Sequence, residues 1–489
     1  MHLMDRTTPS LHDTAIVWFR NDLRIGDNTA LVAASQHASL VPVYIRETGP
    51  PARPLGAARA WWLHHSLSAL SASLDKLGAP LVLRSGDPAD IIEHLVNSIG
   101  ATAVYWNRRY DPAFLEADSA LKARLQARDI VAESFAGQLL HEPTRLRTGS
   151  GKYYKVYSPF WRALEPDVEN RPPLDAPASL EAFPGISGLE TESLDSWDLL
   201  PTKPDWSGGM ARSWTPGETG AHAQLADFLE DRMQGYSDRR DIPGVDATSG
   251  LSPHLASGEI TPAQIFEALK TTDSDAAPDD RNKFRKEIGW REFSWHLLAN
   301  EPALPEKNHN PKFDSFPWLN NAAALTSWQK GLTGYPIVDA GMRQLWQTGW
   351  MHNRVRMVVA SFLTKHLLID WRKGEDWFWD TLVDADPASN AASWQWVAGS
   401  GADASPYFRI FNPVLQGEKF DPDGNYVRRF VPELSEMPNK FIHKPWAAPD
   451  QVRNTAGVHL GDTYPQPIID HQLARNRALA AYQQIKDAA

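Results

Sequence analysis

Polar side chains suited to ligand binding occur among small residues in the C-terminal half of the chain. The segment DADPASNAASW sets Asp384, Asp386 and Asn390 beside alanines and serines, where a flat ligand could approach the backbone. Two acids before a proline can also form an ordinary loop or cap a helix. The segment alone leaves a ligand site and a helix start as open interpretations.

Tryptophans are concentrated in the same half. Eleven of the twenty lie between Trp290 and Trp396. Because each buried indole N–H needs a hydrogen-bond partner, a hydrophobic core alone rarely uses so many. Residues 334–430 also carry apolar side chains at helical spacing, such as Val355 and Val359. An aromatic helical core and a binding site are both compatible with this pattern.

Hydroxyl groups gather in the segment DATSGLS. Thr248, Ser249 and Ser252 supply hydroxyls, Gly250 frees the backbone, and a helix-like run follows. Hydroxyls and backbone N–H groups near a helix N-terminus can hold a pyrophosphate. A Ser/Thr-rich turn before a helix is more often a simple cap. The motif therefore leaves both roles open.

Glu287 and Trp290 span one helical turn in EIGW, so both side chains can face the same cavity. A buried carboxylate paired with a nearby arginine is the alternative role for Glu287.

Length and composition bound the class of protein. At 489 residues the chain is long enough for two or three domains, and its 42% hydrophobic and 22% charged content is typical of a soluble globular protein. No apolar run has the length of a membrane span, and the first residues lack the layout of a secretory signal. The absence of cysteine excludes disulfides, thiolate nucleophiles, thiolate zinc sites and cysteine-ligated clusters. A cytoplasmic enzyme with an organic cofactor fits best.

Net charge and histidine content limit the kinds of nucleic-acid and metal partners that the sequence predicts. A net charge of −11 argues against a wholly basic nucleic-acid-binding domain but leaves room for a local basic strip. Candidates for that strip are Arg281, Lys283, Arg285, Lys286, Arg354, Arg356, Arg409, Lys419, Arg428 and Arg429. For any one cluster, a solvated helix face is the simpler explanation. The sixteen histidines form no HExxH motif, and we expect no metal site.

Hydrophobic periodicity divides the chain into three parts and predicts an α/β plus all-α fold. Within residues 14–140, AIVWF, LVPVYI, PLVLRS, AVYWN and DIVAESF indicate buried parallel strands, which alternate with helical segments such as 59–77 and 112–128. The alternation predicts a doubly wound domain, although the first strand leads into RNDLRIGDN rather than GxGxxG. Residues 141–216 have the composition of a long linker with one short helix in YYKVYSPFWRAL, and residues 217–480 predict an all-helical domain.

Several motifs, in order along the chain, resemble the DNA photolyase/cryptochrome family. VWFRNDLRIGDNTAL, TSGLSPHLASGEI, TGYPIVDAGMRQL, TGWMHNRVRM, LLIDWRKGEDWF and WQWVAGSGADASPYFRIFNPVLQGEKFD all match its pattern. The resemblance covers roughly residues 14–446 and is strongest to cyclobutane pyrimidine dimer photolyases of the class I/III type. It implies an antenna-type α/β domain at 14–140 and a helical domain at 217–480 that binds FAD and the DNA lesion.

The resemblance implies a U-shaped FAD that is active in its reduced anionic form. Asn390 would face N5 of the flavin, and Arg356 would pair with Asp384 beside the ring. A neutral amide can hydrogen-bond a flavin in several redox states, whereas a carboxylate would repel an anionic ring. Gly250 departs from the pattern, because many members carry a basic residue there. The implied cofactor-binding residues are Tyr236, Thr248, Ser249, Gly250, Leu251, Ser252, Arg291, Asn353, Arg356, Asp384, Ala385, Asp386 and Asn390.

Three tryptophans match the electron-transfer chain of the family. By resemblance, Trp394, Trp371 and Trp318 would lead from the flavin to the surface, since an indole is easily oxidised by one electron. The resemblance also gives catalytic roles to Glu287 and Asn390.

On the substrate side, the resemblance implies a pocket for bases displaced from a duplex. Trp290 and Trp396 would offer flat walls, and Glu287 would contact the pyrimidine dimer as a protonated carboxyl. Extrusion costs roughly a few kcal/mol and stacking returns about 1–3 kcal/mol per base, so a lesion that is already unstacked should be favoured. The implied substrate- and DNA-binding residues are Arg240, Glu287, Trp290, Asn353, Arg354, Met357, Trp396 and Gln416.

The implied activity is light-dependent repair of ultraviolet-damaged DNA, in which reduced FAD donates one electron to a pyrimidine dimer, the ring opens and the electron returns. A cryptochrome-type photoreceptor without repair activity is the alternative, and Asn390 favours repair because plant cryptochromes typically carry Asp there. A light-independent flavin oxidoreductase fits worse.

The resemblance also implies an antenna chromophore near Asn107 and Asp111 in YWNRRYDP, with methenyltetrahydrofolate as the first candidate and a deazaflavin or no antenna as alternatives. A surface turn is the alternative role of that segment. We expect damaged DNA as the partner, no membrane, no metal and a monomer.

Overall fold

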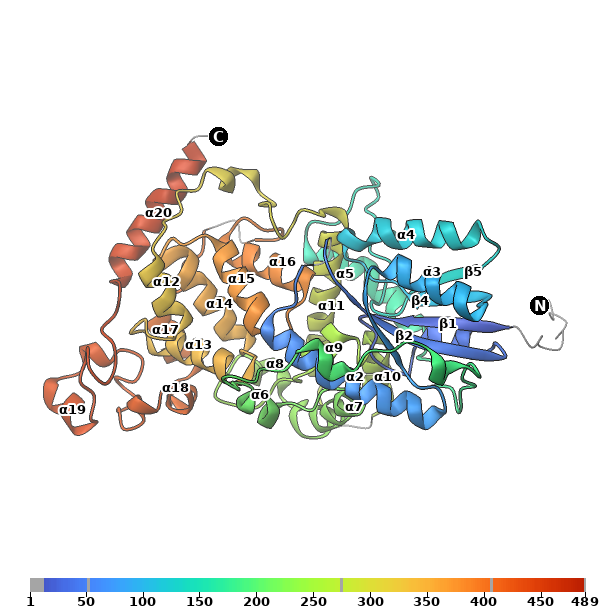
Figure 1. The fold of residues 1–489 in the computed structure, drawn as a ribbon. Coiled ribbons are helices and arrows are strands. Elements are labelled where there is room, and N and C mark those ends of the chain that lie inside the picture. The colour runs from blue at the N-terminus through green and yellow to red at the C-terminus, as the bar shows by residue number, and fades with distance from the viewer. Residues whose placement is uncertain (1–12, 51–52, 273–275, 405–407, 488–489) are drawn as a thin grey trace.

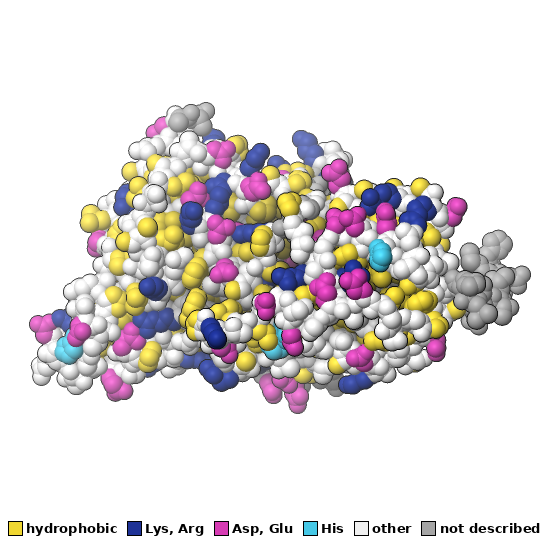
Figure 2. All heavy atoms as spheres, in the orientation of Figure 1, with side chains coloured by type: hydrophobic (Ala, Val, Ile, Leu, Met, Phe, Trp, Pro, Cys, Tyr) yellow, Lys and Arg dark blue, Asp and Glu magenta, His cyan; other side chains and the backbone are white. Residues whose placement is uncertain are grey.

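The chain folds into a sheet domain and a helical domain that lie side by side (Figure 1). The computed structural model describes residues 13–50, 53–272, 276–404 and 408–487. In the described residues, no helix is long and apolar enough to cross a membrane. On the face shown in Figure 2, acidic and basic side chains are interspersed.

The N-terminal domain is a parallel sheet of five strands in the order β3-β2-β1-β4-β5. The strands are β1 (Thr14–Phe19), β2 (Ser39–Glu47), β3 (Val82–Gly86), β4 (Ala103–Asn107) and β5 (Val131–Phe135). All six residues of β1 are buried because helices cover both faces of the sheet. The doubly wound domain and its five strands, predicted from the sequence, are confirmed.

Alternate residues of β1 enter the cores on the two faces of the sheet. Val17 packs with residues of α1 (Thr29–Ala34) and α2 (Ala57–Leu77). Trp18 packs on the other face with residues of α3 (Pro88–Ile99) and α4 (Pro112–Gln126). This two-sided burial follows from the two-residue period of a strand.

The segment RNDLRIGDN, which replaces a glycine-rich nucleotide loop, forms a buried polar network. Arg24 is fully buried and donates to the backbone oxygens of Gly137 and Gly258. Asp22 accepts from the amide of Asn107, and Asn28 caps α1. The segment therefore ties the sheet to the helical domain.

The linker is packed against both domains. Its α5 (Tyr157–Leu164), predicted from YYKVYSPFWRAL, packs on a long helix of the helical domain, α11 (Pro278–Asn300). Farther along, the Leu180 N–H donates to the Leu77 carbonyl, and the Phe183 N–H donates to the Leu40 carbonyl. The linker also contains α6 (Gly208–Ser213).

The helical domain begins with α7 (Glu218–Asp227) and ends with α20 (His471–Asp487), which continues past residue 480, where we expected the domain to end. Four of its helices, α11, α14 (Asn353–Ser361), α15 (Trp371–Thr381) and α16 (Pro387–Ala398), pack together around the interior. The others are α8 (Tyr236–Arg239), α9 (Ser252–Ser257), α10 (Pro262–Thr271), α12 (Ala322–Gln329), α13 (Pro336–Thr348), α17 (Pro413–Phe420), α18 (Asn425–Phe430) and α19 (Asp450–Thr455).

A buried carboxylate joins the two domains. Glu259 follows α9, is completely buried, and accepts from the Trp62 indole at 2.9 Å and from the Ser66 hydroxyl, both on α2. Its other oxygen lies 2.5 Å from Nδ1 of His254. A fully satisfied buried network of this kind fixes one relative arrangement of the domains.

Replacing Glu259 with Ala should lower the free energy of unfolding by about 3–5 kcal/mol, because buried partners lose their acceptor. Urea denaturation measures the change. Glu267→Ala is the matched control: this half-exposed side chain lies 4.0 Å from the Lys270 ammonium one helical turn away, and the change should stay within about 0.5 kcal/mol. Equal losses in the two variants would contradict the role assigned to Glu259.

Candidate functional site

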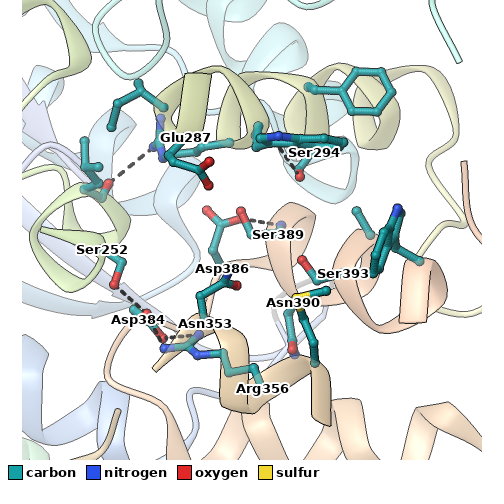
Figure 3. Close-up of a pocket in the computed structure, with 18 of the residues that line it drawn as sticks. Ser252, Glu287, Ser294, Asn353, Arg356, Asp384, Asp386, Ser389, Asn390 and Ser393 are labelled. Carbon is teal, nitrogen blue, oxygen red and sulfur yellow. Dashed lines mark hydrogen bonds and ion pairs between the residues drawn. The ribbon is translucent and has the colours of Figure 1, made fainter. Parts of the chain in front are cut away.

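A cavity of about 580 Å³ opens between α11 on one side and α14 and α16 on the other (Figure 3). It brings together most of the residues singled out in the sequence, although they lie on separate helices. The predicted residues that line it are Tyr236, Arg240, Ser249, Leu251, Ser252, Glu287, Trp290, Arg291, Asn353, Arg354, Arg356, Met357, Asp384, Ala385, Asp386, Asn390, Trp394 and Trp396. Thr248, Gly250 and Gln416 are not among its described lining residues.

An ion pair at one end of the cavity joins α14 to the loop before α16. Arg356 binds Asp384 with both terminal nitrogens, at 3.1 and 2.8 Å. This pairing, expected from the resemblance, is confirmed. Ser252 at the start of α9 donates its hydroxyl to Asp384 at 2.6 Å and accepts from the Trp350 indole at 3.2 Å. The Ser252 proton is thus directed at Asp384, and its oxygen is the atom left for other partners.

Asp386 starts α16 by capping it. Its carboxylate accepts from the Ser389 N–H at 2.7 Å, and Pro387 occupies the first helical position. Asp386 is also buried and lines the cavity. The helix-cap and ligand-site interpretations of this acid are therefore compatible.

One turn later, Asn390 faces the cavity (Figure 3), and a residue of α15 binds its amide nitrogen. Both bonds made by its Nδ2 go to Glu375 of α15, to Oε1 at 2.7 Å and to the backbone oxygen at 3.1 Å. Because the amide hydrogens are used in this way, Oδ1 is the atom that Asn390 can offer to a ligand.

The hydroxyl segment begins α9 at Ser252 as expected, but that helix has only six residues. Gly250 has a φ of +66°, a left-handed conformation that favours glycine, and a Cβ there would lie 2.8 Å from the Gln224 amide nitrogen. Gln224 also donates to the Ser249 carbonyl at 2.7 Å. Gly250 thus adopts this turn without strain, at the position where the resemblance led us to expect a basic residue.

Two aromatic walls stand at the open side. Trp290 of α11 stacks on Tyr157 of α5, with ring centroids 3.8 Å apart and planes 8° from parallel. Trp396 of α16 donates its indole N–H to the Asp403 carbonyl at 3.2 Å. The Asp403 carboxylate in turn accepts from the Tyr157 N–H at 3.2 Å. Asp403 therefore connects the supports of both walls.

Sequence reasoning missed Tyr157 and Asp403 as parts of the site. Burial raises the pKa of the Tyr157 phenol, whose hydroxyl donates to the Lys286 carbonyl at 2.7 Å. Burial also raises the pKa of Asp403. Tyr157 was visible only as part of a short linker helix, and no spacing signal related it to Trp290.

The mouth of the cavity carries paired charges. Glu287 forms an ion pair with Arg240 and lies 3.5 Å from Lys283. Burial disfavours the charged guanidinium of Arg240, but the hydrogen bond and charge of Glu287 outweigh it and raise the pKa of Arg240. Arg354 pairs with Asp241 at 2.6 Å. In this structure Glu287 is thus paired with two cations, whereas the sequence interpretation gave it a protonated carboxyl at the lesion.

His352 lies beside this cluster and caps α14. Its Nδ1 accepts from the Arg354 N–H at 3.2 Å. Burial lowers the pKa of His352 to about 4, so the ring is neutral at pH 7 and adds no charge to the mouth. Gln416 lies on α17, as does Phe420, whose ring is 4.5 Å from the Arg354 guanidinium.

Of the three predicted electron-transfer tryptophans, Trp394 and Trp371 are buried and Trp318 is partly exposed. Trp394 lines the cavity and is almost fully buried, and its ring packs so closely on Gly374 that a Cβ there would lie 2.1 Å away. Trp371 is fully buried and donates to Asn308 at 2.9 Å. Trp318 is partly exposed beside Phe316.

Two further expectations concern the sheet domain and metals. Asn107 is buried, and its amide nitrogen donates to Asp22 at 2.7 Å and to Asn28 at 2.8 Å, so these bonds serve the fold. Asp111 caps α4 by accepting from the Ala113 N–H. Within the described ranges, no group of three or more His, Asp or Glu side chains could hold a metal ion.

Comparison with known proteins gives matches along most of the chain. Residues 15–178 match the family model of DNA photolyase, and residues 284–484 match that of the FAD binding domain of DNA photolyase. A deoxyribodipyrimidine photo-lyase of Agrobacterium fabrum is 60% identical over 472 residues, which are 96% of this chain and 98% of that protein. Cryptochrome-1 of Arabidopsis thaliana is 37% identical over 96% of this chain and 70% of its own length.

A solved structure agrees with these matches. The crystal structure of a bacterial class III photolyase from Agrobacterium tumefaciens superposes with a TM-score of 0.95 at 58% identity, covering 99% of this chain and all of the other. The two family models, the long high-identity match and the shared fold have one explanation: this chain belongs to the DNA photolyase family.

Proposed function

We propose that this chain is a light-dependent deoxyribodipyrimidine photo-lyase that splits cyclobutane pyrimidine dimers in ultraviolet-damaged DNA. One observation carries the proposal: a single cavity joins a polar, charge-paired interior to an opening with two supported tryptophan walls. The interior suits a cofactor and the opening suits bases turned out of a duplex. The 60% identity to a photo-lyase supports the same activity.

The interior fits FAD by the chemistry of its donors. Asn390 offers an acceptor at its Oδ1 atom, and Arg356 and Asp384 supply a charge pair beside it. Ser249 and Ser252 of the 248–252 segment line the same cavity. The Trp394 indole nitrogen adds a buried donor with no partner among the described residues. When bound there, FAD supplies the light-driven one-electron chemistry. The protein residues bind it, orient it and set the charge around it.

The opening fits a flat, displaced lesion. Trp290 and Trp396 present faces on which bases can stack, and stacking returns about 1–3 kcal/mol per base against an extrusion cost of roughly a few kcal/mol. Glu287 is positioned at the same opening by Arg240 and Lys283. Arg354 adds a cation that can meet a phosphate. The near balance of the two energies selects a lesion whose bases are already unstacked.

A cryptochrome-type photoreceptor is the alternative function, since a plant cryptochrome is 37% identical over nearly the whole chain. Two features favour repair. Position 390 is an amide whose orientation is fixed by Glu375, and the aromatic opening is fully assembled for a substrate. The methenyltetrahydrofolate antenna, the monomeric state and the cytoplasmic location remain predictions from the sequence.

The activity test is repair of dimer-containing oligonucleotide by reduced, FAD-loaded protein. We expect dimer loss under near-ultraviolet or blue light and none in the dark, because the proposed electron donor is the light-excited flavin. Liquid chromatography of the digested DNA measures the dimers. Repair that proceeds equally in the dark, or no repair by fully reduced protein, would reject the proposal.

Replacing Tyr157 with Ala should weaken binding of dimer-containing DNA by roughly 2- to 12-fold, since an aromatic stack is worth about 0.5–1.5 kcal/mol. Tyr157→Phe is the matched control, because it keeps the stack on Trp290 and removes only the hydroxyl bond to Lys286. Fluorescence anisotropy with damaged and undamaged duplexes measures both. Equal weakening by the two variants would show that the ring of Tyr157 does not support the wall.

Replacing Trp318 with Phe should greatly slow photoreduction of the oxidised protein, because the partly exposed end of the tryptophan series would be lost. Trp446→Phe is the control, since this partly exposed tryptophan contacts Tyr335 instead. Absorbance under continuous illumination with an external reductant measures both rates. An unchanged rate in Trp318→Phe would contradict the assigned route.

A further inference from the structure

A short segment of the sheet domain touches the helical domain next to the cavity wall. Arg53 lies before α2 and binds Glu375 of α15 with two parallel hydrogen bonds, at 2.8 and 2.9 Å. The same guanidinium donates to Asp376 at 2.9 Å and lies 4.2 Å from the centre of the Trp379 ring. Figure 1 shows α2 and α15 close together, although they belong to different domains.

Backbone contacts fix the position of this segment. The Trp379 indole donates to the Pro54 carbonyl at 2.9 Å, and the Ala57 N–H donates to Asp380 at 3.0 Å. Arg53 therefore approaches Glu375 from an anchored backbone, so its side chain loses little additional freedom in forming the pair.

Glu375 connects Arg53 to a residue that lines the cavity. Its side chain is 4% exposed, and Oε1 accepts both from Arg53 and from Nδ2 of Asn390, the latter at 2.7 Å. Three side chains thus form a continuous path from the partly exposed Arg53 to the cavity lining.

The charge of Glu375 determines how Asn390 is oriented. A carboxylate can only accept hydrogen bonds, so Asn390 must present its Nδ2 to Glu375 and its Oδ1 to the cavity. A buried carboxylate without a cation favours its neutral form, which can donate a hydrogen bond. A neutral Glu375 could therefore bond Oδ1 and allow the amide to turn its N–H groups towards the cavity.

We propose that Arg53 is a positioning residue that holds the Glu375 carboxylate as a hydrogen-bond acceptor across the domain interface and so fixes Oδ1 of Asn390 as the acceptor facing the flavin. The inference rests on the proposed function only in requiring FAD beside Asn390. An acceptor at this place favours a ring that carries hydrogen on N5, and a donor favours the oxidised ring, whose N5 accepts. Arg53 thereby stabilises reduced flavin without touching it.

Replacing Arg53 with Met should shift the ratio of reduced to oxidised flavin, at a fixed applied potential, roughly tenfold towards oxidised, the size expected for one hydrogen bond. For a two-electron couple this is about 30 mV. Spectroelectrochemistry of FAD-loaded full-length protein measures it and does not depend on repair. Arg53→Lys keeps a cation and should recover most of the wild-type potential.

Two further variants separate orientation of Asn390 from a general loosening of the interface. Asp376→Asn removes only the exposed partner of Arg53 and should leave the potential unchanged. Glu375→Gln should lower the potential, and adding Arg53→Met to it should lower it little further, because the two residues act through one path. Additive shifts would overturn the inference.

The outcomes distinguish this inference from the proposed function. Equal potentials in FAD-loaded wild type and Arg53→Met would overturn the inference alone. A chain that takes up no FAD would overturn both.

Discussion

Every acidic side chain described at the core of the site is held by an arginine or by helix N–H groups, and the rest of the structure depends on this pairing. Asp384 is bound by Arg356, Glu287 by Arg240, and Glu375 by Arg53, while Asp386 caps α16. Unpaired, such groups would have to lose their charge or leave the interior. Because each of these acids is paired, the helical domain can contain a large polar cavity. The charges around the cavity are balanced before a cofactor binds.

Contacts near the cavity also join the two domains and the linker into one unit. Arg53 and the α2 residues that bind Glu259 come from the sheet domain, and Tyr157 comes from the linker. Each meets the helical domain within a few residues of the cavity lining. The sheet domain is therefore a structural support of the site whether or not it carries an antenna chromophore.

Aromatic residues play two distinct roles around the cavity. Trp290 and Trp396 are partly exposed at the opening, and each has a defined support, a stacked ring for one and a hydrogen bond for the other. Trp394 is buried in the cavity wall, and Trp371 is buried outside the lining, between packed helices. The concentration of tryptophan in the sequence thus reflects both an opening for flat ligands and a buried aromatic series.

Much of the fold could be predicted because it follows from local pattern. Strands such as AIVWF are continuous apolar runs, and α16 begins where Asp386 and Pro387 predict a start. The cavity residues were found largely through family motifs. The partners of those residues could not be predicted: Arg53 and Glu375 are 322 positions apart, and only tertiary packing joins them. The same holds for Tyr157 and Trp290, and for the internal bonds of Asn107, which sequence reasoning placed near an antenna.

The central claim is that this charge-paired cavity holds FAD with its ring beside Asn390 and its open side towards Trp290 and Trp396. A crystal structure of the purified protein tests this most directly. The account predicts one FAD per chain, with the ring edge within hydrogen-bonding distance of Asn390 Oδ1 and the Arg356–Asp384 pair intact. FAD bound elsewhere, or a chain that purifies colourless and refuses added FAD, would contradict it.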